Sequence, residues 1–241
     1  MKCLLIKNAD VYAPHPLGIV DILIINDKIA KIGPQLAAPQ DLDCQILDAQ
    51  KRKVVPGYVD QHVHIIGGGG ESGPYSRTPE INLSELTKVG ITTVVGVLGT
   101  DGTSRHNESL LAKARALTHE GITAYMLTGS YEIPLHNMTG DVRRDIILIN
   151  ECLGIGEVAL SDHRSSQPTR EELEKVLTQA RLGGMLSGKA GVVQFHMGVG
   201  KRGMDVLLAI VRETEIPARH FIPTHVNRAF HLFEQAKEFA R

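Results

Sequence analysis

Between residues 54 and 241, six apolar, strand-like runs alternate with six helical stretches, and this alternation constrains the fold more than any other feature. Regular alternation of this kind is typical of parallel α/β proteins, including (β/α)8 barrels. Thr169 followed by Glu171 and Glu172 marks one helix start, because a capping threonine and acidic residues stabilise the first turn. The predicted strands cover residues 54–59, 92–98, 123–128, 155–160, 191–195 and 221–224, and the predicted helices cover residues 83–89, 109–119, 143–150, 170–183, 203–214 and 228–241.

Residues 1–53 have a different pattern, with short strand-like runs and no helical stretch between them. Apolar or alternating runs cover residues 4–6, 20–25, 28–32 and 46–48. Asn26-Asp27 joins two of these runs and predicts a β-hairpin. The sequence therefore predicts a small N-terminal β-module over residues 1–53, followed by an α/β domain over residues 54–241.

Residues with reactive side chains follow the predicted strands of the α/β domain. In a (β/α)8 barrel the chemistry gathers at the carboxyl ends of the strands, so these positions predict an active site at one edge of the sheet. They are His62 and His64 at the first strand, Thr100 and Asp101 at the second, Tyr131 at the third, Glu157 with Asp162, His163 and Arg164 at the fourth, His196 at the fifth, and His225 with Arg228 at the sixth.

His62 and His64 are two residues apart, so on a strand both imidazoles leave the same face. Imidazole is a good ligand for zinc and similar metals. Together with His196, His225 and the carboxylate of Glu157, these histidines could hold two divalent ions with a hydroxide between them as the nucleophile. Two other interpretations remain open: a hydrogen-bonded polar edge for the first pair, and a buried ion-pair role for Glu157.

Charged and phenolic side chains at the same edge predict a small zwitterionic substrate. The hydroxyl of Tyr131 could donate to a developing oxyanion, and Arg164 and Arg228 could grip carboxylates in bidentate fashion. Glu71, directly after four glycines, could hold an ammonium group. The alternatives are packing for the tyrosine, structural ion pairs for the arginines and a mobile loop for the glycines, which match no phosphate-binding pattern.

Composition excludes several other classes of protein. The 26 basic and 27 acidic residues form no charged block, and tryptophan is absent, which argues against a nucleic-acid partner. No apolar run is long enough to cross a membrane. Cys3, Cys44 and Cys152 are sparse and far apart, which predicts free thiols, a reducing compartment and a cytoplasmic location.

Several motifs together resemble one family. The stretch from Val54 to His64 after a β-module is similar to the amidohydrolase superfamily, and other segments narrow the resemblance to isoaspartyl (β-aspartyl) dipeptidases. Those segments are Gly67-Gly-Gly-Gly-Glu71, Arg77-Thr-Pro-Glu80, Gly99-Thr-Asp-Gly-Thr103, Gly129-Ser-Tyr131, Ser161-Asp-His-Arg-Ser165, His196-Met-Gly198 and Pro223-Thr-His-Val-Asn-Arg228.

The resemblance implies a metal-dependent hydrolase with a (β/α)8 TIM-like barrel, of which about six βα units are present, and an N-terminal module that is part of a composite β-sandwich. It implies an enzyme with two zinc ions that hydrolyses the β-aspartyl bond of dipeptides and forms homo-oligomers. By the family pattern, His62 and His64 bind one metal, and His196 and His225 bind the other. Glu71, Thr100, Tyr131, Arg164 and Arg228 match positions that contact substrate.

The chain departs from the family pattern in two ways. Glu157 stands where the family carries a carboxylated lysine, so we expect a bridging carboxylate that needs no bicarbonate. The chain ends at Arg241, before the eighth strand that carries the family's catalytic aspartate, so we expect the chain by itself to be weakly active or inactive. Alternatives to the dipeptidase are another amidohydrolase, such as a cyclic-amide hydrolase or deaminase, and a truncated, catalytically impaired paralogue.

Overall fold

The computed structural model describes residues 1–241, which form two compact units. The first unit covers Met1–Gly57 and the second covers Tyr58–Arg241. None of the helices combines the length and the apolar character that crossing a bilayer requires.

The first unit is a mixed β-sheet. Its strands are β1 (Cys3–Tyr12), β2 (Pro16–Ile25), β3 (Lys28–Gly33), β4 (Cys44–Asp48) and β5 (Lys53–Val54). They lie in the order β3-β2-β1-β4, with β5 also paired to β1. The β2–β3 pair is antiparallel and turns at Asn26-Asp27, which confirms the predicted hairpin. Strands β4 and β5 run parallel to β1, a pairing that local sequence did not indicate.

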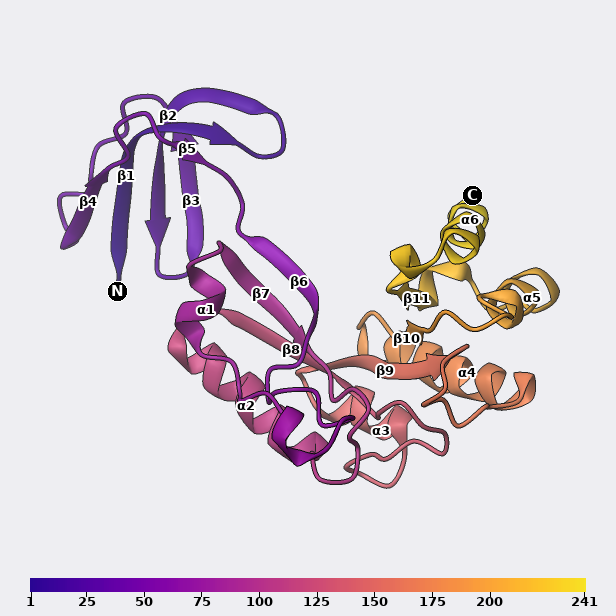
Figure 1. Cartoon of the computed structure of the whole chain (residues 1–241). Helices are drawn as coiled ribbons and strands as arrows, with labels where there is room; N and C mark the ends of the chain where they lie inside the picture. The colour runs from indigo at the N-terminus through magenta and orange to yellow at the C-terminus, as the bar shows by residue number, and fades with distance from the viewer. The chain divides into compact units, whose positions relative to one another are not determined.

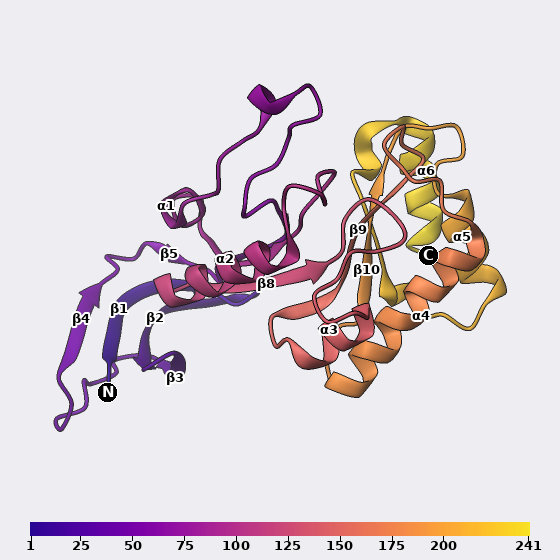
Figure 2. The same cartoon turned by 90° about the horizontal axis from the view of Figure 1, so that it is seen from below.

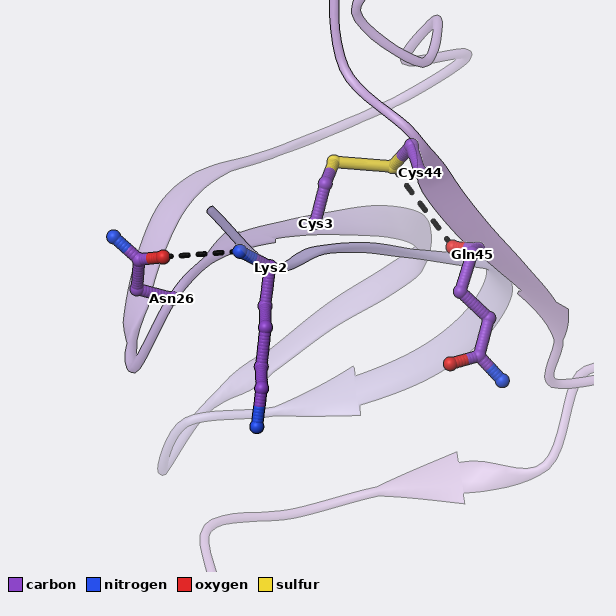
Figure 3. Close-up of a disulfide and its surroundings, with 5 residues drawn as sticks. All are labelled: Lys2, Cys3, Asn26, Cys44 and Gln45. Atoms are coloured by element: carbon purple, nitrogen blue, oxygen red, sulfur yellow. Dashed lines mark hydrogen bonds between the residues drawn. A yellow bond between two sulfur atoms is a disulfide. The ribbon is translucent and has the colours of Figure 1, made fainter.

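The cysteines depart from the prediction of free thiols. Cys3 on β1 and Cys44 on β4 are direct neighbours in the sheet, and they form a disulfide (Figure 3). Only Cys152 is free, and it is buried, which raises the pKa of its thiol to about 12. The cysteine count therefore no longer indicates a reducing compartment. The prediction was wrong because the pairing depends on the register of two strands that are distant in sequence.

The second unit is a parallel α/β half-barrel (Figure 1). Its six strands lie in sequence order across the sheet, as the alternation predicts. The strands are β6 (Tyr58–Val63), β7 (Ile91–Gly96), β8 (Thr123–Thr128), β9 (Cys152–Leu160), β10 (Val192–Met197) and β11 (Phe221–Thr224). The helices are α1 (Leu83–Thr87), α2 (Asn107–Glu120), α3 (Val142–Leu148), α4 (Arg170–Ser187), α5 (Asp205–Glu213) and α6 (Phe230–Phe239).

The largest boundary error in the second unit concerns its first strand. Residues 54–59 do not form a single strand: Val54 ends β5 of the first unit, and β6 of the second unit begins only at Tyr58. Pro56 and Gly57 lie in the break, where proline cannot donate a ladder hydrogen bond and glycine adds freedom. The later start of β6 places His62 inside the strand and His64 directly after it.

The two faces of the parallel sheet carry different side chains. One face packs on the helices, with Val94, Met126, Val158 and Phe195 in the main hydrophobic core, and α4 lies beside β9 and β10 (Figure 2). Because successive strand residues point to opposite faces, the residues that alternate with these point away from the helices. Glu157 precedes Val158 and His196 follows Phe195, so both belong to the face without helices.

Helix starts follow their local sequence. Thr169 and Glu172 form a complete capping box at α4, as predicted, because each side chain bonds to the other residue's backbone N–H. Asp141 caps α3 by accepting from the backbone N–H groups of Arg143 and Arg144. These caps fix the residues at which the loops after the strands end and the helices begin.

Candidate metal centre

Four histidines and one glutamate from four strands meet at the carboxyl end of the half-barrel. His62 is on β6, Glu157 on β9 and His196 on β10, while His64 and His225 directly follow β6 and β11. They form two groups that share Glu157: one with His62 and His64, the other with His196 and His225. In each group the candidate ligand atoms all lie within 4.8 Å of one another.

Glu157 lies between the two histidine pairs. Its Oε1 is 3.4 Å from His62 Nε2 and 3.7 Å from His64 Nε2. Its Oε2 is 3.2 Å from His196 Nδ1 and 3.7 Å from His225 Nε2. Each carboxylate oxygen therefore faces one of the two histidine pairs.

The electrostatics of Glu157 suit a bound cation. The residue is fully buried, and burial alone would raise the pKa of its carboxyl, but contacts with His196, His225 and His62 hold that pKa well below its usual range. Yet Oε1 has no hydrogen-bond partner, and neither has Nδ1 of His62 or His64. A buried carboxylate without a full set of partners is costly unless a cation neutralises it. The donor set therefore fits divalent metal ions.

The histidine environment suits metal binding as well. Partial burial lowers the pKa of His64, which favours the neutral imidazole that a metal ion requires. Gly99, at the loop after β7, has φ of +77°, and a Cβ there would stand 2.7 Å from His64 Cε1. Only glycine leaves room for the ring at this position.

Tyr131 reaches the centre from the loop after β8. Its side chain is buried, and its hydroxyl lies 2.6 Å from His196 Nδ1. Burial, reinforced by the nearby charge of Glu157, raises the pKa of the phenol above its ordinary value. The hydroxyl therefore stays protonated and remains a hydrogen-bond donor at neutral pH.

The predicted substrate-contacting residues form one connected group. Arg164 Nη1 donates to Glu71 Oε1 at 3.1 Å, and Thr100 Oγ1 donates to the same oxygen at 2.9 Å. Arg228 Nη1 lies 3.1 Å from His196 Nε2. The structure thus brings these predicted substrate-contacting residues and the histidine group together at one edge of the sheet. The hydrogen bond from its own backbone N–H, with those from Thr100 and Arg164, holds the pKa of Glu71 below its ordinary value.

Hydrogen bonds tie the four-glycine loop to its neighbours. The buried Arg105 donates to the carbonyls of Gly68 and Gly69, at 2.7 and 3.1 Å. Arg77, later in the same loop, donates to Asp101 at 2.7 Å. Glu71 is therefore presented by an anchored loop rather than by the free loop that the glycine run allowed.

Sequence reasoning placed Asp101 and Asp162 at strand ends without assigning them a role, and it missed Arg105. Asp162 binds Arg164, and Asp101 and Arg105 hold the glycine loop. The ambiguous His163 points to solvent, with 88% of its side chain exposed. A weak signal for Asp162 was present, because an aspartate two residues before an arginine at a strand end can form a local ion pair.

Comparisons with known proteins agree with the resemblance that the sequence motifs indicated. No protein-family model matches the chain. A solved β-aspartyl dipeptidase from Fervidobacterium islandicum AW-1 matches with 47% identity and a TM-score of 0.95, over 99% of this chain and 65% of that chain. The same protein in complex with β-Asp-Leu matches with a TM-score of 0.94, over 99% of this chain and 62% of that chain. The chain thus has the amidohydrolase fold and is similar to these solved dipeptidases.

Curated relatives of this chain are more distant. An imidazolonepropionase from Photorhabdus laumondii is 29% identical over 120 residues, 48% of this chain and 29% of that protein. A dihydroorotase from Pediococcus pentosaceus is 27% identical over 182 residues, 75% of this chain and 40% of that protein. The chain thus spans less than half of these curated relatives and less than two thirds of the solved dipeptidase.

Proposed function

We propose that this chain carries the metal centre and most of the substrate site of a β-aspartyl dipeptidase. The observation that carries the proposal is the 47% identity over 99% of the chain with a dipeptidase whose structure was solved with β-Asp-Leu. The convergence of Glu157 and four histidines supports the same conclusion from the chain's own chemistry.

We propose two zinc ions at this centre, one held by His62 and His64 and the other by His196 and His225, with Glu157 contacting both. Imidazole nitrogen and carboxylate oxygen are common zinc ligands. When bound, such ions activate water and polarise a carbonyl. The unpartnered Oε1 of Glu157 supports this assignment, because it is buried and no protein donor satisfies it.

The remaining residues act on the dipeptide. The protonated hydroxyl of Tyr131 donates to the carbonyl oxygen as negative charge develops on it, a contribution typically worth about 10²- to 10³-fold in rate. A β-aspartyl dipeptide carries two carboxylates and one ammonium group. Arg164 and Arg228 match the carboxylates, and Glu71 with Thr100 matches the ammonium group.

A second candidate function is hydrolysis of a cyclic amide. A dihydroorotase from Staphylococcus aureus is 34% identical over 132 residues, although these cover only 30% of that protein. Both reactions use the same metal chemistry, so the substrate-binding residues decide between them. A cyclic amide such as dihydroorotate has one carboxylate and needs only one arginine grip.

The experiment compares β-Asp-Leu, α-Asp-Leu and dihydroorotate with the zinc-loaded protein. Calorimetry measures binding to the chain, and hydrolysis is measured in the same samples. We expect selective binding of β-Asp-Leu, and loss of this binding in Arg228→Ala with zinc content unchanged. Preference for dihydroorotate, or equal binding of the α- and β-linked dipeptides, would refute the dipeptidase proposal.

A further inference from the structure

A buried carboxylate that neither the metal group nor the predicted substrate contacts include lies beside both. Asp162 is in the loop directly after β9, and only 7% of its side chain is exposed. It is two residues from Arg164 in sequence, and its side chain contacts both Arg164 and His196.

Asp162 holds the guanidinium of Arg164 on two sides. Its Oδ1 accepts from the backbone N–H and from Nε of Arg164, each at 2.9 Å, and its Oδ2 accepts from Nη2 at 2.9 Å. This bidentate pairing fixes the plane of the guanidinium. The remaining nitrogen, Nη1, is thereby directed to Glu71 at 3.1 Å.

The second oxygen of Asp162 also faces His196. Its Oδ2 lies 3.3 Å from His196 Nε2, while the other ring nitrogen, Nδ1, lies 3.2 Å from Glu157 Oε2. The imidazole therefore presents Nδ1 to the metal group and Nε2 to Asp162. Metal-binding histidines commonly donate their second N–H to a carboxylate, which fixes the orientation of the ring.

Two guanidinium groups near His196 Nε2 cannot take this role. Arg164 Nη2 lies 2.9 Å away and Arg228 Nη1 lies 3.1 Å away, but guanidinium groups only donate hydrogen bonds. When Nδ1 serves as a ligand, the ring proton is on Nε2 and needs an acceptor. The Tyr131 hydroxyl lies 3.4 Å from Nε2 but 2.6 Å from Nδ1, so it bonds to the other ring nitrogen. Asp162 is the carboxylate placed to accept the proton of Nε2.

We propose that Asp162 is a positioning residue that aligns the metal ligand His196 and the substrate-binding Arg164 through a single carboxylate. The assignment rests on the proposed function for the role of Arg164, whereas the His196 contact requires only that the centre binds metal. One substitution at Asp162 should therefore weaken both zinc binding and dipeptide binding.

The test is Asp162→Asn, which keeps the size of the side chain but removes its charge. We expect zinc affinity, measured by competition with a chromogenic chelator, to fall about 10- to 100-fold. We expect KM for β-Asp-Leu, or the calorimetric Kd where turnover is slow, to rise about 10-fold or more. Asp162→Glu keeps a carboxylate and should recover part of the zinc affinity.

Glu151→Gln is the matched control. Glu151 immediately precedes β9 at its other end, and it also pairs with an arginine, Arg115, at 2.8 Å. We expect this variant to keep both zinc affinity and dipeptide binding. Arg164→Lys separates the two roles, because it should weaken dipeptide binding while zinc affinity stays unchanged.

Several outcomes would overturn the proposal. If Asp162→Asn weakens dipeptide binding but leaves zinc affinity unchanged, Asp162 serves Arg164 alone. If Glu151→Gln or Arg164→Lys lowers zinc affinity as much as Asp162→Asn does, the effect is general destabilisation. If the wild-type protein binds zinc but not β-Asp-Leu, the proposed function fails, and the zinc affinities still decide whether Asp162 orients His196.

Discussion

Asp21 in the first unit and Glu157 in the second are both buried carboxylates, but the chain neutralises them differently. Asp21 is 3% exposed and Glu157 is fully buried. Asp21 accepts backbone N–H bonds from Asn8 and Leu36, each at 2.9 Å, and pairs with Lys7 at 2.9 Å. The hydrogen bond from Asn8, with the contacts of Lys7 and Leu36, lowers the pKa of its carboxyl.

The ion-pair contacts of Glu157 are all with imidazoles, and none is with a lysine or an arginine. One of its oxygens accepts no hydrogen bond at all. The two residues show how a structural buried carboxylate differs from a functional one: the oxygens of the structural one are satisfied by the protein itself. Asp21 is satisfied by the fold and holds strands together, whereas Glu157 is left for a ligand that carries positive charge.

The largest effect should come from Glu157→Gln. Because this change removes the shared ligand, we expect zinc affinity to fall by more than about 100-fold, beyond the effect typical of residues that only support a ligand. In metal-free protein the same change should cost less stability than it does with zinc bound, because the carboxylate is then held only by its imidazole contacts.

Thermal unfolding with and without zinc measures both the zinc affinity and the stability of the metal-free protein. Zinc at 100 times its Kd should stabilise the wild-type protein by about 2.7 kcal/mol for each site filled and leave Glu157→Gln nearly unaffected. If metal-free Glu157→Gln unfolds at a much lower temperature than metal-free wild type, Glu157 has a structural role like that of Asp21.

A smaller effect is expected from Asp21→Asn. The amide cannot accept from both backbone N–H groups, and Lys7 loses its partner, so the first unit should lose about 1–3 kcal/mol of stability. Hydrogen exchange of the β1 and β2 amides, under non-reducing conditions, should show protection about 5- to 150-fold lower, with or without zinc. The matched control is Asp27→Asn, an exposed residue 3.7 Å from Lys28, which should change little.

Acid should remove the contribution of Asp21. Its pKa is lowered in the folded protein, so its stabilisation is fully present above the unfolded value of 3.8 and is lost as pH falls towards the folded value. The ratio of β1 protection between wild type and Asp21→Asn should therefore shrink as pH falls below 3.8. A ratio that stays constant with pH would contradict this role for the carboxylate.

The smallest effect concerns bicarbonate. Glu157 supplies its own carboxylate, so removing carbon dioxide and bicarbonate should leave zinc affinity unchanged. Chelator competition in degassed buffer, with chloride replacing bicarbonate at equal ionic strength, measures this. A loss of zinc that bicarbonate restores would mean that another group forms the bridge.

Local sequence was sufficient for the elements of the second unit and for the residue types of its centre. Strand β8 and helix α4 begin at the predicted residues because apolar patterning and capping act over short stretches. The i, i+2 spacing of His62 and His64 and their position at a strand end predicted two ligands on one face, and both Nε2 atoms do lie near Glu157 Oε1.

The sequence by itself determined the order of the elements and the identity of the reactive side chains at the strand ends. Tertiary structure decided which of them touch: the Cys3–Cys44 disulfide, the Arg105 bonds to the glycine loop and the place of Asp162 between His196 and Arg164. The physical reason is that periodicity and capping are properties of neighbouring residues. Contacts between distant segments depend instead on strand register and loop packing, which form only when the whole sheet assembles.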